Sequence, residues 1–147
     1  MSTKATASRT ASPLATLRAA VSLRHPTNLT AAMHIGHQQA ELLHKILNTH
    51  GKDLLERITC LPGITVTAIN HLPVASTAFW GNGHWNIHIR EQDLPERQRF
   101  NALHQLKHII DHPGRRATRA DDVRLSDEDE ELVADHFANC FLIIEAI

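Results

Sequence analysis

The sequence predicts an α+β fold in which a small antiparallel or mixed sheet packs against helices. Three observations lead to this class. Apolar residues recur at three-and-four spacings between residues 29 and 58, as they do in amphipathic helices. Two segments, 64–69 and 84–90, alternate apolar and polar residues as half-buried strands do. Two more helical patterns follow, each after a residue that can cap a helix N-terminus.

Composition indicates a soluble globular protein with one main core. The chain has 147 residues, of which 42% are hydrophobic and 21% charged. It contains no run of about 18 apolar residues, the length that a membrane span needs, so we expect a cytoplasmic protein. The two cysteines, Cys60 and Cys140, are far apart and in no CxxC arrangement. We therefore expect neither a disulfide framework nor a thiolate zinc site.

Residues 1–27 are predicted to be a disordered basic tail. They are rich in Ser, Thr, Ala and Arg, and the first acidic residue of the chain is Glu41. Organellar transit peptides share this composition, although a plain tail is the favoured interpretation. Residues 28–147 are predicted to form a single domain. That domain is net acidic and has no basic stripe interleaved with aromatic residues, so no specific nucleic-acid binding is predicted.

The domain is expected to begin with two helices that are separated near Gly51. The apolar residues that define them fall at helical spacings, namely Leu42, Leu43, Ile46, Leu47, Leu54, Leu55 and Ile58. A turn at 61–63 then leads into a strand over 64–69, and a second strand fits 76–80. The glycine turn at 81–83 joins this second strand to 84–90, so a hairpin with one wet face is predicted.

The last two helices are predicted from their caps. Asp93 and Glu96 form a capping box for a helix that should end near His112, because Pro113 and Gly114 follow it. Ser126 can cap the final helix, whose first turn carries four acidic residues that suit the positive end of the helix dipole.

Chemistry is predicted where these two helices meet. His104 and His108 are four residues apart, so their imidazoles lie one turn apart on one helix face and can bind one tetrahedral ion. Such a pair, taken alone, is more often two exposed surface histidines. On the final helix, Glu131 lies on one stripe with Ala134 and Ala138, which permit close helix approach. Two imidazoles, one carboxylate and an open fourth position are the ligand set of catalytic zinc.

Two segments carry a resemblance to a known family. ERQRFNALHQLKHIIDH and EELVADHFANCFLI resemble the metal-binding HExxH helix and the third-ligand helix of the ImmA/IrrE metallo-endopeptidases. The resemblance extends more loosely over residues 54–142. It implies a zincin-like fold, with a small sheet packed against a metal-binding helix pair, and a Zn²⁺ ion bound by His104, His108 and Glu131.

Three positions depart from the family pattern. Gln105 stands where the general-base glutamate is expected, Lys107 where glycine is usual, and Asp135 where asparagine is common. Because an amide cannot accept a proton from water, the change at Gln105 should lower the rate by on the order of 10² to 10⁴. Asp111 is poorly aimed to replace the missing base, and Glu128 and Glu130 are better explained as stabilising a helix terminus. We expect a metallopeptidase-family protein with impaired catalysis.

Other polar residues are weaker candidates for the site. His112 and Asp135 are assigned to the surroundings of the metal ligands, and His88 to a substrate cleft beside them. A further group, His34, His37 and His44, shares helical spacings and leaves a second metal site open. No carboxylate or cysteine accompanies that group at matched spacing, so a solvated helix face is the favoured interpretation.

Three functions remain open at this level. The chain is a weakened peptidase acting on helix-turn-helix repressors or antitoxins, a pseudopeptidase or regulatory module that binds such a partner without cleavage, or an unmetallated helical interaction module. A protein or peptide partner is expected in each case, and no membrane partner in any.

Overall fold

The computed structural model describes residues 12–19, 26–48, 53–117 and 125–147, without the side chains of 114–117. In chain order the elements are α2 (Pro13–Arg18), α3 (Leu29–Leu47), α4 (Leu54–Thr59), β1 (Ile64–Ile69), β2 (Ser76–Gly81), β3 (His84–Arg90), α5 (Pro95–Ala117) and α6 (Asp127–Ala146). The predicted α+β class is confirmed. None of the described helices is long and apolar enough to cross a membrane.

The sheet is mixed, one of the two forms that the sequence predicts. Its strand order is β1-β3-β2, with β1 parallel and β2 antiparallel to β3. Asn82 and Gly83 connect β2 to β3, and both have positive φ, at 56° and 81°. This is the backbone of the two-residue hairpin turn that Asn-Gly favours. Because β3 is the central strand, β1 and β2 are the two edges of the sheet.

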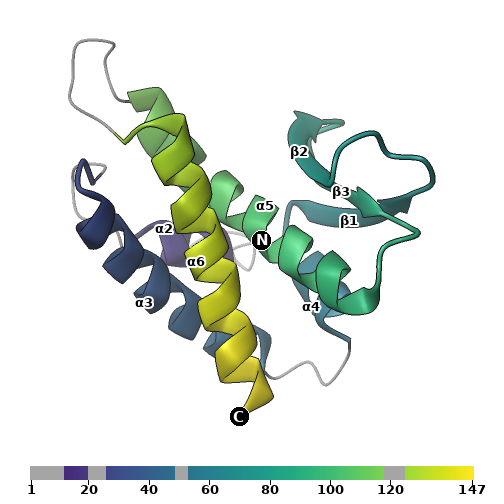
Figure 1. Ribbon diagram of the computed structural model, residues 1–147, viewed down its shortest axis with the longest axis horizontal. Coiled ribbons are helices and arrows are strands. Elements are labelled where there is room, and N and C mark those ends of the chain that lie inside the picture. The colour runs from purple at the N-terminus through teal and green to yellow at the C-terminus, as the bar shows by residue number, and fades with distance from the viewer. Residues whose placement is uncertain (1–11, 20–25, 49–52, 118–124) are drawn as a thin grey trace, which may run out of the picture.

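Helix α5 connects the sheet to the remaining helices. Figure 1 shows α6 crossing in front of α5, with the sheet beside the N-terminal half of α5 and α3 on the far side of α6. The sheet presents Ile87 and Ile89 to this core, while α6 contributes Phe137 and Phe141, all four essentially without solvent exposure. Helix α5 is thus held between the sheet and α6. The packing determines which face of α5 contacts the sheet and which contacts α6.

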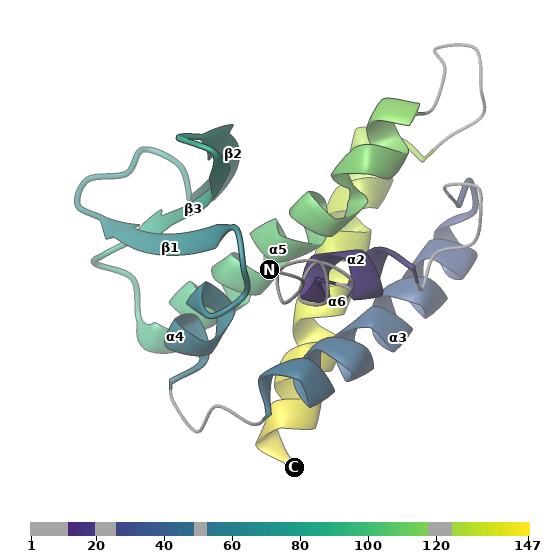
Figure 2. The same cartoon turned by 180° about the vertical axis from the view of Figure 1, so that it is seen from behind.

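The structure differs from the sequence prediction in two places, the C-terminal end of α5 and the segment that contains α2. Helix α5 runs through Pro113 to Ala117 instead of ending near His112. Helix α2 forms within the segment expected to be a disordered tail, and its Leu17 is fully buried. Residues 1–11 and 20–25 of that segment lie outside the described residues. Figure 2 shows α2 lying on the side of the molecule opposite to α6.

One contact explains both differences. Proline has no N–H group, so Pro113 cannot donate to the carbonyl of Ile109 one turn earlier. Arg18 of α2 supplies donors at this point: its Nη2 donates to Ile109 O at 2.9 Å and its Nε to Ile110 O at 3.2 Å. Burial lowers the pKa of this guanidinium, while Asp111 acts in the opposite direction. Helix α2 is therefore part of the domain, and it supports α5 where proline weakens it.

Candidate metal centre

Three side chains from α5 and α6 converge on a common point. His108 Nε2 lies 2.7 Å from Glu131 Oε2, and His104 Nε2 lies 3.0 Å from Glu131 Oε1. The two Nε2 atoms are 3.2 Å apart. Over the ranges that the structure describes, this is the one group of three or more His, Cys, Asp or Glu residues whose donor atoms all lie within 4.8 Å of one another. The predicted trio is brought together.

Local sequence explains the convergence. The two histidines are one turn apart on α5, and α6 begins at its Ser126 cap, whose Oγ accepts from the N–H of Asp129 at 3.0 Å. Ala134 and Ala138 are fully buried, so α6 can approach its neighbours closely at these positions. Glu131 lies one turn before Ala134, and its carboxylate reaches both rings.

The donors fit a zinc ion in type and spacing. A tetrahedral ion with bonds of about 2.0–2.1 Å to nitrogen holds two ligand atoms about 3.3 Å apart, close to the spacing of the two Nε2 atoms. Burial lowers the pKa of His108, an effect that Glu131 partly offsets and His104 reinforces. A lowered pKa favours the neutral imidazole, which is the form that binds a metal.

Asp135, which the sequence analysis assigned to the surroundings of the ligands, contacts one of the two imidazoles. Its Oδ1 lies 2.8 Å from His104 Nδ1. If the Nδ1–H group donates to this carboxylate, the lone pair of Nε2 is left pointing at Glu131 and the ion position. Carboxylates commonly hold metal-binding histidines in this way.

Gln105 lies beside the ligands and is anchored to the sheet. Its Nε2 donates to Ser76 Oγ at 3.0 Å, which fastens the amide to the first residue of β2. An open groove of about 310 Å³ runs between β2 and α5, and Gln105, His108 and Glu131 all line it. Sequence reasoning missed Ser76, because a serine at the start of a strand carries no signal of its own.

The two other predicted histidines take different positions. His112 lines the groove, with its ring edge-on to Trp85 at 5.0 Å between centroids. His88 lies on the other face of β3, because side chains alternate along a strand and Ile87 and Ile89 face α5. There its ring contacts Phe79 at 4.9 Å. The structure thus places His88 away from the cleft where it was expected.

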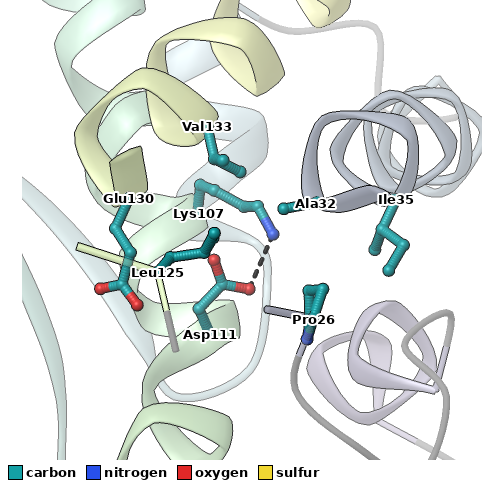
Figure 3. A pocket seen from close by; sticks show the side chains of 8 residues that line it. All are labelled: Pro26, Ala32, Ile35, Lys107, Asp111, Leu125, Glu130 and Val133. Carbon is teal, nitrogen blue, oxygen red and sulfur yellow. Dashed lines mark hydrogen bonds and ion pairs between the residues drawn. The ribbon is translucent and has the colours of Figure 1, made fainter. Parts of the chain in front are cut away.

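Lys107, the third position that departs from the family pattern, lies away from the groove. The acidic residues considered as replacements for the missing base also lie away from it. Lys107 is 3% exposed, and its Nζ lies 2.7 Å from both Gln39 Oε1 and Asp111 Oδ1. Figure 3 shows Lys107 and Asp111 joined beside a small cavity of about 10 Å³, which Glu130 also lines. Asp111 and Glu130 are therefore turned to a different cavity from the one beside Gln105. Glu128 is exposed in the first turn of α6.

Comparison with protein families supplies independent information. The family model Peptidase_M78, described as the IrrE N-terminal-like domain, matches residues 62–147. This match begins just before β1 and includes the sheet and both helices of the candidate metal centre. Neither the curated proteins nor the solved structures give a match.

Proposed function

The chain belongs to the Peptidase_M78 family of IrrE N-terminal-like domains, and from this premise we propose that it is a zinc-binding metallopeptidase relative with impaired catalysis. The observation that carries the proposal is the convergence of His104, His108 and Glu131 within 4.8 Å of one another. A zinc ion bound there would polarise a peptide carbonyl and make a water molecule more acidic. The residues of the chain determine how far that chemistry proceeds.

Impaired catalysis follows from Gln105. A peptidase of this type needs a base that takes a proton from water and later returns it to the leaving amine. The Gln105 amide lines the groove beside His108 and Glu131, so it can hydrogen-bond a water molecule, but it cannot accept the proton. Loss of a positioned base costs on the order of 10² to 10⁴ in rate. Residual hydrolysis should therefore be slow.

The groove suits an extended segment of a protein partner. Strand β2 is an edge strand and forms one wall of the groove, so a peptide can hydrogen-bond along it as an added strand. Trp85 lines the groove, and the ring of Trp80 on β2, which is 61% exposed, contacts it, so the two rings offer an apolar surface beside β2. As partner class we propose a helix-turn-helix transcriptional repressor, and as location the cytoplasm, where such repressors act.

A second candidate function is a pseudopeptidase or regulatory module that binds its partner without cleavage. The position of Gln105 favours it, because the amide lines the groove and hydrogen-bonds Ser76 but cannot accept a proton from water. Binding of a partner in the groove requires no base.

Zinc content tests the proposal. Untagged protein would be loaded with Zn²⁺, freed of excess metal and measured by elemental analysis alongside the double variant His104→Ala, His108→Ala. We expect the double variant to hold one zinc per chain fewer than the natural protein. His84→Ala, an imidazole on the sheet turn, is the matched control and should hold as much as the natural protein. Equal zinc in the natural protein and the double variant would overturn the proposal.

A further inference from the structure

A second cluster of metal-binding side chains lies between α3 and α6. Cys140 Sγ lies 3.4 Å from His37 Nδ1 and 3.4 Å from His136 Nε2. The sequence shows His136 and Cys140 four residues apart on α6, but it gives no sign that His37 of α3 joins them. We propose that Cys140, His136 and His37 form a second zinc site, with a water molecule as fourth ligand.

Parallel packing of α3 and α6 brings the three residues together. Ala32 of α3 packs with Val133 early in α6, while His44 of α3 lies against Phe141 later in α6. Between these levels, a Cβ on Gly36 would lie 3.8 Å from the side chains of both Val133 and Phe137. The two helices are thus in close contact one residue before His37. His37 is consequently held level with the turn of α6 that carries the thiol.

The spacing around the sulfur matches zinc. With bonds of about 2.3 Å to sulfur and 2.0–2.1 Å to nitrogen, a tetrahedral zinc holds its sulfur and nitrogen ligands about 3.5 Å apart. Both sulfur–nitrogen distances in the cluster are 3.4 Å. The three donor atoms do not all lie within 4.8 Å of one another, in contrast to the first site, so one ring must turn for all three to bind. The His37 side chain is 48% exposed and has room to do so.

Glu41 completes the arrangement around His37. Its Oε1 lies 3.6 Å from His37 Nε2, the ring nitrogen that does not face the sulfur. This contact is longer than the 2.8 Å contact of Asp135 with His104 in the first site, so the His37 ring keeps freedom to turn, and the carboxylate can hydrogen-bond the second nitrogen once the ring has turned. Burial, and then the Glu41 carboxylate, raise the pKa of the Cys140 thiol.

The two sites use different faces of α6. Glu131 and Asp135 turn toward α5, whereas His136 and Cys140 turn toward α3. The first site contains no sulfur. A spectroscopic signal from a metal–thiolate bond therefore reports on the second site alone, whether or not the first one binds zinc.

Cobalt(II) is the probe, since it replaces zinc and gives a near-ultraviolet charge-transfer absorption when a thiolate binds it. The full chain carrying His104→Ala and His108→Ala would be titrated with Co²⁺ under reducing, oxygen-free conditions. We expect the thiolate band to saturate at one Co²⁺ per chain and to disappear when Zn²⁺ is added. Cys140→Ser should abolish the band, and the matched control Cys60→Ser should keep it, because Cys60 is exposed and far along the chain.

Histidine variants keep the test valid if the buried Cys140→Ser substitution unfolds the chain. His37 lies on an exposed face of α3, so His37→Ala should remain folded by circular dichroism while its apparent Co²⁺ affinity falls at least tenfold. His136→Ala should behave in the same way. The inference is overturned if the natural cysteines give no thiolate band, if the band depends on Cys60, or if neither histidine substitution weakens it.

Discussion

Restoring a carboxylate at position 105 should raise peptidase activity with little change in structure. Gln105→Glu keeps the side-chain length, and the Ser76 hydroxyl, now 3.0 Å from the Gln105 amide nitrogen, can rotate to donate to the new carboxylate. The anchored position beside His108 and Glu131 is thereby retained. A positioned base contributes on the order of 10² to 10⁴ in rate, which corresponds to about 3 to 5 kcal/mol of activation free energy. We therefore expect kcat/KM to rise by that factor.

The assay is cleavage of a helix-turn-helix repressor or of a mixed peptide library by zinc-loaded protein, followed by mass spectrometry. Gln105→Ala is the matched control and should stay at the level of the natural protein, because it removes the amide without adding a base. Adding His104→Ala to Gln105→Glu should abolish the gain. Equal cleavage by the natural protein and Gln105→Glu, at equal zinc content, would refute the assignment of this position as the place of the base.

Three further outcomes test the site and its support. Asp135→Asn should weaken zinc binding by roughly 10- to 100-fold in a chelator competition, since the His104 ring loses its charged partner; unchanged affinity would show that the ring is held by packing. Arg18→Ala should lower the free energy of unfolding by about 2 kcal/mol in urea denaturation. The loss of stability caused by Arg18→Ala should be smaller in a Pro113→Ala background, where the backbone N–H of residue 113 can donate to Ile109 O. If the effects of the two substitutions on the free energy of unfolding were strictly additive, this account would be contradicted. The pKa of Glu145 is lowered from its ordinary value of 4.5, chiefly by the hydrogen bond from Arg57. The ionised carboxylate of Glu145 therefore stabilises the fold above pH 4.5, and this stabilisation is lost as the pH falls through the lower pKa of the folded state. The stability difference between the natural protein and Glu145→Gln should therefore vanish in acid, and a constant difference would exclude the linkage.

Local sequence patterns predict most of this fold, because each pattern depends only on residues of a single helix, strand or turn. The alternation over 84–90 and the Asn-Gly turn define the hairpin, and Ser126 marks the start of α6 where the structure has it. Pro113 shows the limit of such rules. The cost of a proline in a helix is local, but the Arg18 side chain that offsets it comes from a segment more than 90 residues earlier. No spacing in the sequence reports that contact.

The same limit separates the two proposed metal sites. His104 and His108 are identified by spacing within α5, and Glu131 by its place in a second motif that accompanies the first. The cysteine pattern predicts no thiolate zinc site, because it contains no partner for Cys140. Its partner His37 is more than 100 residues away, and their contact depends on how α3 lies against α6. Such a register is a property of packing and not of either helix.

The departures from the family pattern have unequal consequences, and the structure gives the reason. Lys107 is larger than the glycine that the resemblance implies, yet it points away from the ligands, and its ammonium is held by Gln39 and Asp111. It therefore changes the packing between helices without touching the metal centre. Gln105 is nearly isosteric with glutamate and faces the groove, so under the proposed function it should remove the proton-accepting base without disturbing the ligands. Under the proposed function, substitution at position 105 should therefore alter hydrolysis without altering metal binding, whereas loss of the metal ligands should remove both.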